Sequence, residues 1–250
     1  MKQAGFDLTG PIGSKATLAL VVLQADETIE QDFRRLFPDR DIAIYISRIP
    51  SGEALSSDTI AEMKENLPHS ARLFPRAARF DAVGYGCTSG TTLIGADAVA
   101  AMIRQGVKTP FVTDPLTAAL AALRALDVTH LGLVTPYVKD IAAPVRDAFI
   151  AAGFQVSETV TFGEAVEARV ARIAPASIKA AARQAAQGAQ AVFLSCTNLR
   201  TLDIINDLEA ELGLPVLSSN QVLAWHMGQL TGAPLASDFA GRLSKMAIPA

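Results

Sequence analysis

The feature that most constrains the fold is an alternation of short apolar runs with segments of helical apolar spacing. Runs that are apolar throughout are typical of parallel strands, which are buried on both faces. Alternation with helices of this length predicts parallel sheets covered by helices on both sides. We expect strands at residues 16–23, 41–46, 80–85, 110–113, 130–134, 154–161, 191–194 and 215–217. Among the helices, we expect one that Pro68 interrupts, one from about residue 95 to 105, and a last one at 222–230 capped by Ser219 and Asn220.

The second half of this pattern repeats the first. In each half two strand–helix units precede a strand that delivers a cysteine, and a short strand after a Pro follows. This order indicates an internal duplication and an α/β fold of two pseudo-symmetric Rossmann-like lobes. We expect one lobe of residues 1–115 plus 221–250 and another of residues 116–220. Ligands of such sheets bind beyond the carboxyl ends of the strands, so we place the active site in the cleft between the lobes.

A single Rossmann-type domain is the alternative, but the first strand is not followed by Gly-x-Gly-x-x-Gly, and no phosphate-cradling loop occurs elsewhere. We therefore expect no nucleotide cofactor. The 250 residues are 50% hydrophobic and 19% charged, which predicts a folded chain. A net charge of −3 without a basic stripe argues against nucleic-acid binding. No apolar run is long enough to span a bilayer and the first residues do not resemble a signal peptide, so we expect a cytoplasmic location and free thiols.

The chain has only two cysteines, and they occupy matching positions. Cys87 and Cys196 each follow a buried strand and precede small hydroxylated residues and then a helix-like segment. Backbone N–H groups and the helix dipole at such a position stabilise a thiolate and bind carboxylates. Two thiols on opposite sides of a carbon acid can invert a stereocentre without a cofactor, one removing a proton and the other supplying one.

The residues after each cysteine are candidate hydrogen-bond donors to the carboxylate of the developing enolate. They are Thr88 and Ser89 in the first loop and Thr197 and Asn198 in the second. Burial of both cysteines for structural reasons is the alternative. No metal site is expected, because two separated cysteines and three scattered histidines lack ligand spacing.

From about residue 17 to 230 the chain resembles the Asp/Glu racemase superfamily, in its branch of maleate cis-trans isomerases and arylmalonate decarboxylases. The resemblance rests on Gly-Cys-Thr-Ser at 86–89, Val-Thr-Pro-Tyr at 134–137, Val-Ala-Arg-Ile at 170–173, Ser-Cys-Thr-Asn at 195–198 and Leu-Pro-Val at 214–216. It implies two α/β lobes, cofactor-independent chemistry and a substrate contact from Tyr137. Decarboxylases of the branch keep only the second cysteine, so Cys87 favours an isomerase.

Two positions depart from the maleate isomerase pattern. Asp26 stands where those enzymes carry an asparagine after the first strand, and Glu167 stands near a second asparagine. Carboxylates facing a dianionic substrate are unfavourable, whereas they suit a substrate with an ammonium group. Alternatively, either acid caps a helix. Residues 21–27 also look like members of the branch assigned to ectoine utilisation, which would imply an amino acid substrate.

These observations leave three functions open. The first is an isomerase or racemase of a small, amino-substituted carboxylic acid that uses Cys87 and Cys196. The second is a lyase of the arylmalonate decarboxylase kind that uses mainly Cys196. The third is a non-catalytic metabolite-binding protein. The expected partner is thus a small carboxylate, with neither nucleic acid nor membrane, and Ala-rich helices suit a homo-oligomer as well as internal packing.

Overall fold

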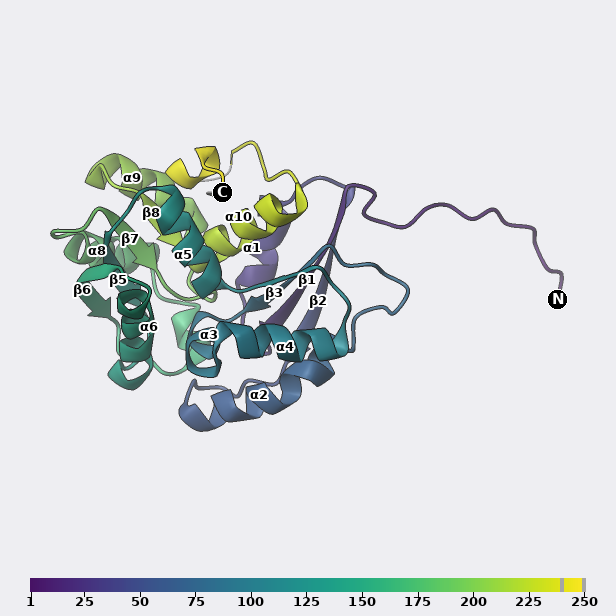
Figure 1. Ribbon diagram of the computed structural model, residues 1–250, viewed down its shortest axis with the longest axis horizontal. Coiled ribbons are helices and arrows are strands. Elements are labelled where there is room, and N and C mark those ends of the chain that lie inside the picture. Colours follow the sequence, from purple (N-terminus) through teal and green to yellow (C-terminus); the bar gives the residue numbers. More distant parts are fainter. Residues whose placement is uncertain (239–240, 249–250) are drawn as a thin grey trace.

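The computed structural model describes residues 1–238 and 241–248 and consists of two four-stranded parallel sheets with helices around them (Figure 1). The first sheet has the strand order β2-β1-β3-β4 and the second the equivalent order β6-β5-β7-β8, which confirms the predicted duplicated α/β fold. The strands are β1 (Ala16–Leu23), β2 (Ile42–Ile49), β3 (Ala82–Gly86), β4 (Phe111–Thr113), β5 (His130–Thr135), β6 (Gln155–Thr161), β7 (Ala191–Leu194) and β8 (Val216–Ser218).

Helices follow the strands as the apolar spacing predicts. They are α1 (Ile29–Leu36), α2 (Ser57–Ala71), α3 (Thr88–Ile94), α4 (Ala96–Gly106), α5 (Pro115–Ala125), α6 (Lys139–Ala151), α7 (Glu167–Val170), α8 (Pro175–Ala185), α9 (Ile205–Leu212) and α10 (Ser219–Thr231), with short 3₁₀ turns at Leu202–Ile204 and Arg242–Lys245. Helix α10 follows β8 of the second sheet but packs against α5 and β3 of the first half (Figure 1). The lobe boundaries at residues 115 and 220 stay predictions.

The sequence interpretation was wrong at three helices. We expect Pro68 to interrupt α2, but the helix continues to Ala71, because the proline removes only one backbone hydrogen bond and the buried Leu67 keeps the turn packed. Helix α3 was missed, since its Thr-Ser-Gly-Thr-Thr sequence has weak helix propensity. The last helix is capped by Ser218, one residue before the predicted cap, in a capping box with Gln221.

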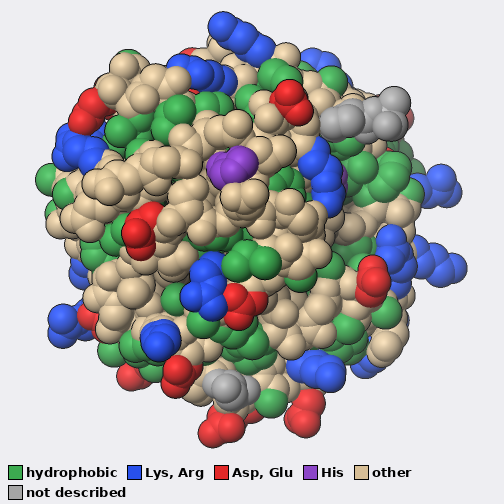
Figure 2. Space-filling model, turned by 60° about the vertical axis from the view of Figure 1, so that its left-hand side comes forward, with side chains coloured by type: hydrophobic (Ala, Val, Ile, Leu, Met, Phe, Trp, Pro, Cys, Tyr) green, Lys and Arg blue, Asp and Glu red, His purple; other side chains and the backbone are tan. Residues whose placement is uncertain are grey.

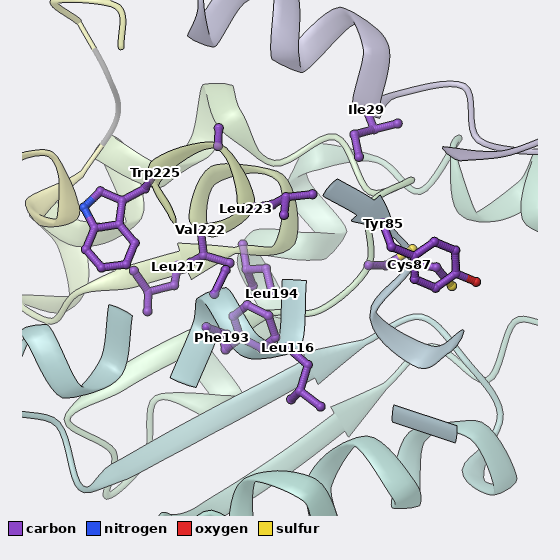
Figure 3. Packing of buried hydrophobic residues seen from close by; sticks show 14 of the residues in the cluster. Ile29, Tyr85, Cys87, Leu116, Phe193, Leu194, Leu217, Val222, Leu223 and Trp225 are labelled. Carbon is purple, nitrogen blue, oxygen red and sulfur yellow. The ribbon is translucent and has the colours of Figure 1, made fainter. Parts of the chain in front are cut away.

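Every residue of the central strands β1, β3 and β7 is buried, as parallel strands covered on both faces require, and so is every residue of the edge strand β8. Close packing of helix on sheet is tightest at Gly132 of β5, where an added Cβ would lie 1.9 Å from the carbonyl oxygen of Ala185 in α8. Trp225 of α10 is buried at one side of the apolar cluster, while Tyr85 and Cys87 lie together at the other (Figure 3).

Residues 1–12 are exposed and extend away from the two sheets (Figure 1). Lys, Arg, Asp and Glu side chains are interspersed over the face in Figure 2, which shows no stripe of one charge. Among the helices in the described ranges, none has the length and apolar character to cross a membrane.

Candidate active site

Cys87 lies where β3 passes into α3, at the carboxyl end of its sheet. It is the N-cap residue of α3, and its Sγ accepts the backbone N–H of Gly90 at 3.1 Å. The side chain is buried, with 3% of its surface exposed. The thiol therefore occupies the amino end of a helix, as the sequence predicts, although this helix is α3 and not the later α4.

Cys196 occupies the equivalent place after β7 in the second sheet. Its Sγ accepts the backbone N–H of Asn198 at 3.3 Å and lies 3.1 Å from the hydroxyl of Tyr137. The residue is as buried as Cys87 and has a φ of 155°, a backbone conformation that side-chain-bearing residues rarely adopt. Unusual backbone conformations held by their surroundings are typical of functional sites.

Asp26 joins the loop after β1 to the second cysteine loop. One carboxylate oxygen accepts the N–H groups of Thr28 and Ile29, each at 2.8 Å, at the amino end of α1. The other accepts the hydroxyl of Thr197 at 2.7 Å. Asp26 thus caps the amino end of α1, which is the alternative role considered for it, and it also holds the loop that carries Cys196. Its contact with a substrate stays a prediction.

Glu167 is held by side chains and not by the amides of its own helix. Its carboxylate accepts the hydroxyl of Tyr137 at 2.8 Å and the amide of Asn198 at 2.9 Å. The carbonyl oxygen of the Asn198 amide in turn accepts the backbone N–H of Glu27 at 2.9 Å, so this side chain connects the loop after β1 to α7. Tyr137, Glu167 and Asn198, all candidate site residues named from the sequence, therefore belong to one hydrogen-bonded network.

Ser219, the first residue of α10, was assigned from the sequence only to a helix cap. Its hydroxyl oxygen accepts the backbone N–H of Cys196 at 3.0 Å and lies 2.8 Å from the hydroxyl of Thr88. It therefore links the two cysteine loops directly. The available signal was its place immediately after β8, at the same sheet edge as Cys196. Ser89 is buried beside Thr88 on α3.

Two segments from different halves of the chain lie against each other next to this network. Ala54 and Val166 form an antiparallel bridge, and the N–H of Glu167 donates to the carbonyl of Glu53 at 3.0 Å. A salt bridge of 2.7 Å joins Arg172 to Glu27 nearby. A surface hollow of about 550 Å³ borders these segments and is lined by residues 24, 25, 27, 52, 53, 166 and 168.

Burial dominates the acid–base properties of the site. It raises the pKa of Cys87 to about 12 and that of Cys196 well above the usual value, and the negative charges of Glu167 and Asp26 raise both further. Burial also raises the pKa of the Asp26 and Glu167 carboxyl groups. Within the described residues, no Lys, Arg or His side chain forms a salt bridge with either carboxylate. The site therefore concentrates negative charge beside two neutral thiols.

The parts of the chain that the structure covers contain no group of three or more His, Cys, Asp or Glu residues with metal-binding geometry. The buried His226 instead lies with its Nδ1 2.7 Å from the hydroxyl of Thr113, and burial lowers its pKa to about 4.

Known proteins share both this architecture and much of the sequence. Residues 95–244 match the arylmalonate decarboxylase family model. The chain is 30% identical to an arylmalonate decarboxylase of Bordetella bronchiseptica, over 88% of this chain and 92% of that protein, and 26% identical to a maleate isomerase of Nocardia farcinica, over 90% and 94%. A crystal structure of a maleate cis-trans isomerase variant from Nocardia farcinica, with a covalently bound succinylcysteine intermediate, superposes with a TM-score of 0.81 at 25% identity over 92% of this chain and 98% of that one. The chain therefore belongs to the arylmalonate decarboxylase family.

Proposed function

We propose that this protein is a cofactor-independent isomerase or racemase of a small carboxylic acid, with Cys87 and Cys196 as its catalytic pair. The observation that carries the proposal is the equivalence of the two thiols. Each follows the third strand of its sheet and accepts a backbone N–H, and Ser219 joins their loops. A single-thiol reaction does not require this second, matching cysteine.

For racemisation, one thiolate removes the α-proton and the other thiol delivers a proton to the opposite face of the same carbon. The electron pair of the broken C–H bond moves into the carboxylate to form an enediolate, which hydrogen-bond donors stabilise. Thr88 is a candidate donor. Since Ser219 oxygen accepts the N–H of Cys196, its own hydrogen is available to Thr88, whose hydroxyl hydrogen is then free for the substrate.

For cis-trans isomerisation, a thiolate adds to one alkene carbon and the π electrons move to the neighbouring carbon. Rotation about the resulting single bond precedes expulsion of the thiolate. A covalently bound succinylcysteine, as named for the Nocardia farcinica isomerase variant, is the adduct that forms when the neighbouring carbon also takes a proton, for which the second thiol is a candidate donor; that proton must leave again before the thiolate is expelled. The two routes differ in hydrogen exchange, because only racemisation must break the bond to the α-hydrogen.

The charge of the site supports an amino-substituted substrate. Asp26 and Glu167 are buried, and neither forms a salt bridge among the described side chains, although the charge of Arg48 acts on Asp26. The adjoining hollow is lined by Glu53 and by Glu27, which is paired with Arg172. A buried carboxylate is stabilised by an opposite charge at close range. An ammonium group on the substrate supplies this opposite charge. By neutralising the carboxylate, it also favours ionisation of the thiols.

The test is proton NMR of the purified protein in heavy water with maleate, aspartate, glutamate and diaminobutyrate derivatives. We expect conversion of one of these acids, with α-deuterium incorporation if the reaction is racemisation. Tight binding of one acid with no conversion would instead identify a metabolite-binding protein.

A lyase remains the second candidate, because a decarboxylase is among the relatives and shares 30% of its residues with this chain. Such an enzyme needs one thiol to protonate an enediolate. Cys87→Ala separates the two functions: it abolishes a reaction that needs both thiols, whereas decarboxylation of an arylmalonate through Cys196 survives it.

A further inference from the structure

Tyr137 stands between a thiol and a carboxylate. Its hydroxyl donates its only hydrogen to Glu167 at 2.8 Å, so at the 3.1 Å contact with Cys196 the thiol must be the donor and the phenol oxygen the acceptor. The three groups form a directed chain from S–H through O–H to a carboxylate oxygen. All three side chains have 3% of their surface exposed, which excludes bulk water as the immediate proton acceptor for the sulfur.

We propose that Glu167 is the proton acceptor for Cys196 and acts through Tyr137. The thiol proton moves to the phenol oxygen while the phenol proton moves to Glu167, which leaves a thiolate, a neutral tyrosine and a neutral carboxylic acid. The reverse shift restores the thiol. The chain carries one negative charge before and after the transfer, so a thiolate forms without adding charge to a buried site.

Charge explains why this route is favoured over ionisation to solvent. The ionisable groups that face Glu167 are Tyr137, Cys196, Cys87 and Asp26, and each of them is neutral or negative. A proton released to water would leave a thiolate beside an ionised Glu167, and burial with like charge disfavours that state strongly. Burial raises the pKa of Glu167, so this carboxylate is a better proton acceptor for the thiol than an exposed glutamate would be.

Cys87 provides a matched thiol without such a relay. The neighbouring tyrosine, Tyr85, also interacts with the sulfur of its cysteine, but its hydroxyl donates to the sulfur of Met63 at 3.8 Å and not to a carboxylate. The two cysteines are equally buried, and both feel the charges of Glu167 and Asp26. A difference in how their reactivity depends on pH therefore reports the relay and not burial.

The experiment measures alkylation of each cysteine by iodoacetamide between pH 6 and 9, resolved by peptide mass spectrometry. Because an internal transfer is independent of bulk pH once Glu167 has ionised, we expect the Cys196 profile to become flat as the pH rises past the raised pKa of Glu167. Cys87 should react about tenfold faster for each pH unit, as for a thiol that ionises to solvent below its pKa. Glu167→Gln and Tyr137→Phe each interrupt the chain and should give Cys196 the same tenfold dependence.

A Cys196 profile that parallels Cys87 in the unaltered protein would overturn the relay, as would a flat profile that persists in Glu167→Gln. Glu167→Asp keeps the charge but shortens the reach to Tyr137, and it serves if the glutamine variant does not fold. The relay rests on the proposed acid–base function, yet the two fail separately. Alkylation needs no substrate, so loss of all turnover rejects the function and leaves this result standing.

Discussion

The hydroxyl of Thr197 donates to the carboxylate of Asp26 at 2.7 Å, across 171 residues of sequence. The same carboxylate accepts two backbone N–H groups at the start of α1. The second cysteine loop is therefore fastened to the amino end of a helix in the first half of the chain. The position of Cys196 depends on contacts that no local sequence segment contains.

Replacing Thr197 with Val should destabilise the fold by about 1–3 kcal/mol, because a buried carboxylate oxygen of Asp26 loses its donor. Urea unfolding followed by circular dichroism measures this change. Thr201→Val is the matched control, since the buried hydroxyl of Thr201 has no hydrogen-bond partner among the residues that the structure describes. Its replacement should leave the free energy of unfolding within about 1 kcal/mol. Equal losses in both variants would contradict the assigned role of the Thr197–Asp26 bond.

Asp26→Asn should keep the fold and make both thiols more reactive. The asparagine oxygen can accept the N–H groups of Thr28 and Ile29, while the Thr197 hydroxyl turns to the carbonyl of Gly86, 3.2 Å away. We expect unfolding free energy to change by about 1 kcal/mol or less. Removal of the negative charge lowers the pKa of Cys87 and Cys196, so alkylation at pH 8 should accelerate at both. Slower alkylation at both sites would contradict the charge assignment.

Asp32 makes stability depend on pH. It accepts the amide of Asn220 at 2.8 Å, and burial raises the pKa of its carboxyl group from 3.8 to about 7. Because the folded protein holds this proton more tightly than the unfolded chain, stability is greatest below the unfolded pKa and falls as pH rises from 4 to 7. Asp32→Asn should remove this loss of stability. We expect it to raise the free energy of unfolding by up to about 4 kcal/mol at pH 8 and to change it little at pH 4. Urea unfolding midpoints of the two proteins at pH 4 and pH 8 test this prediction. An equal difference between the proteins at both pH values would contradict it.

Gly132→Ala tests the packing of α8 on β5. The added methyl carbon would lie 1.9 Å from the carbonyl oxygen of Ala185, so strand or helix must move. We expect a cost of about 3 kcal/mol or more in thermal or urea unfolding. Gly10→Ala is the control, because nothing lies within 4 Å of an added Cβ there. A wild-type midpoint for Gly132→Ala would show that the packing is looser than described.

Much of the fold follows from the sequence, because hydrophobic periodicity reports burial directly. Strand β1 has the predicted bounds, and the repeat of the strand–helix order predicts two equivalent sheets. Helix α3 could not be found this way, since its sequence has neither apolar spacing nor strong helix formers. It forms where the sulfur of Cys87 accepts the N–H of Gly90 in its first turn.

The candidate site could be predicted only in part. The two cysteines stand out because their local contexts match, and Asp26 and Glu167 stand out as departures from a family pattern. The partners of these side chains could not be predicted, because they depend on how the halves meet. The bond from Ser219 to the backbone of Cys196 spans 23 residues, and that from Asn198 to Glu167 joins a loop to a separate helix.

The most direct test of the central claim, that both thiols act on one substrate, is the kinetics of Cys87→Ser, Cys196→Ser and the double variant on whichever acid the NMR assay identifies. Groups that act together in one step are not additive, so we predict that each single variant loses as much kcat as the double variant. Substantial turnover by Cys87→Ser, with loss confined to Cys196→Ser, would contradict the claim and identify a single-thiol enzyme.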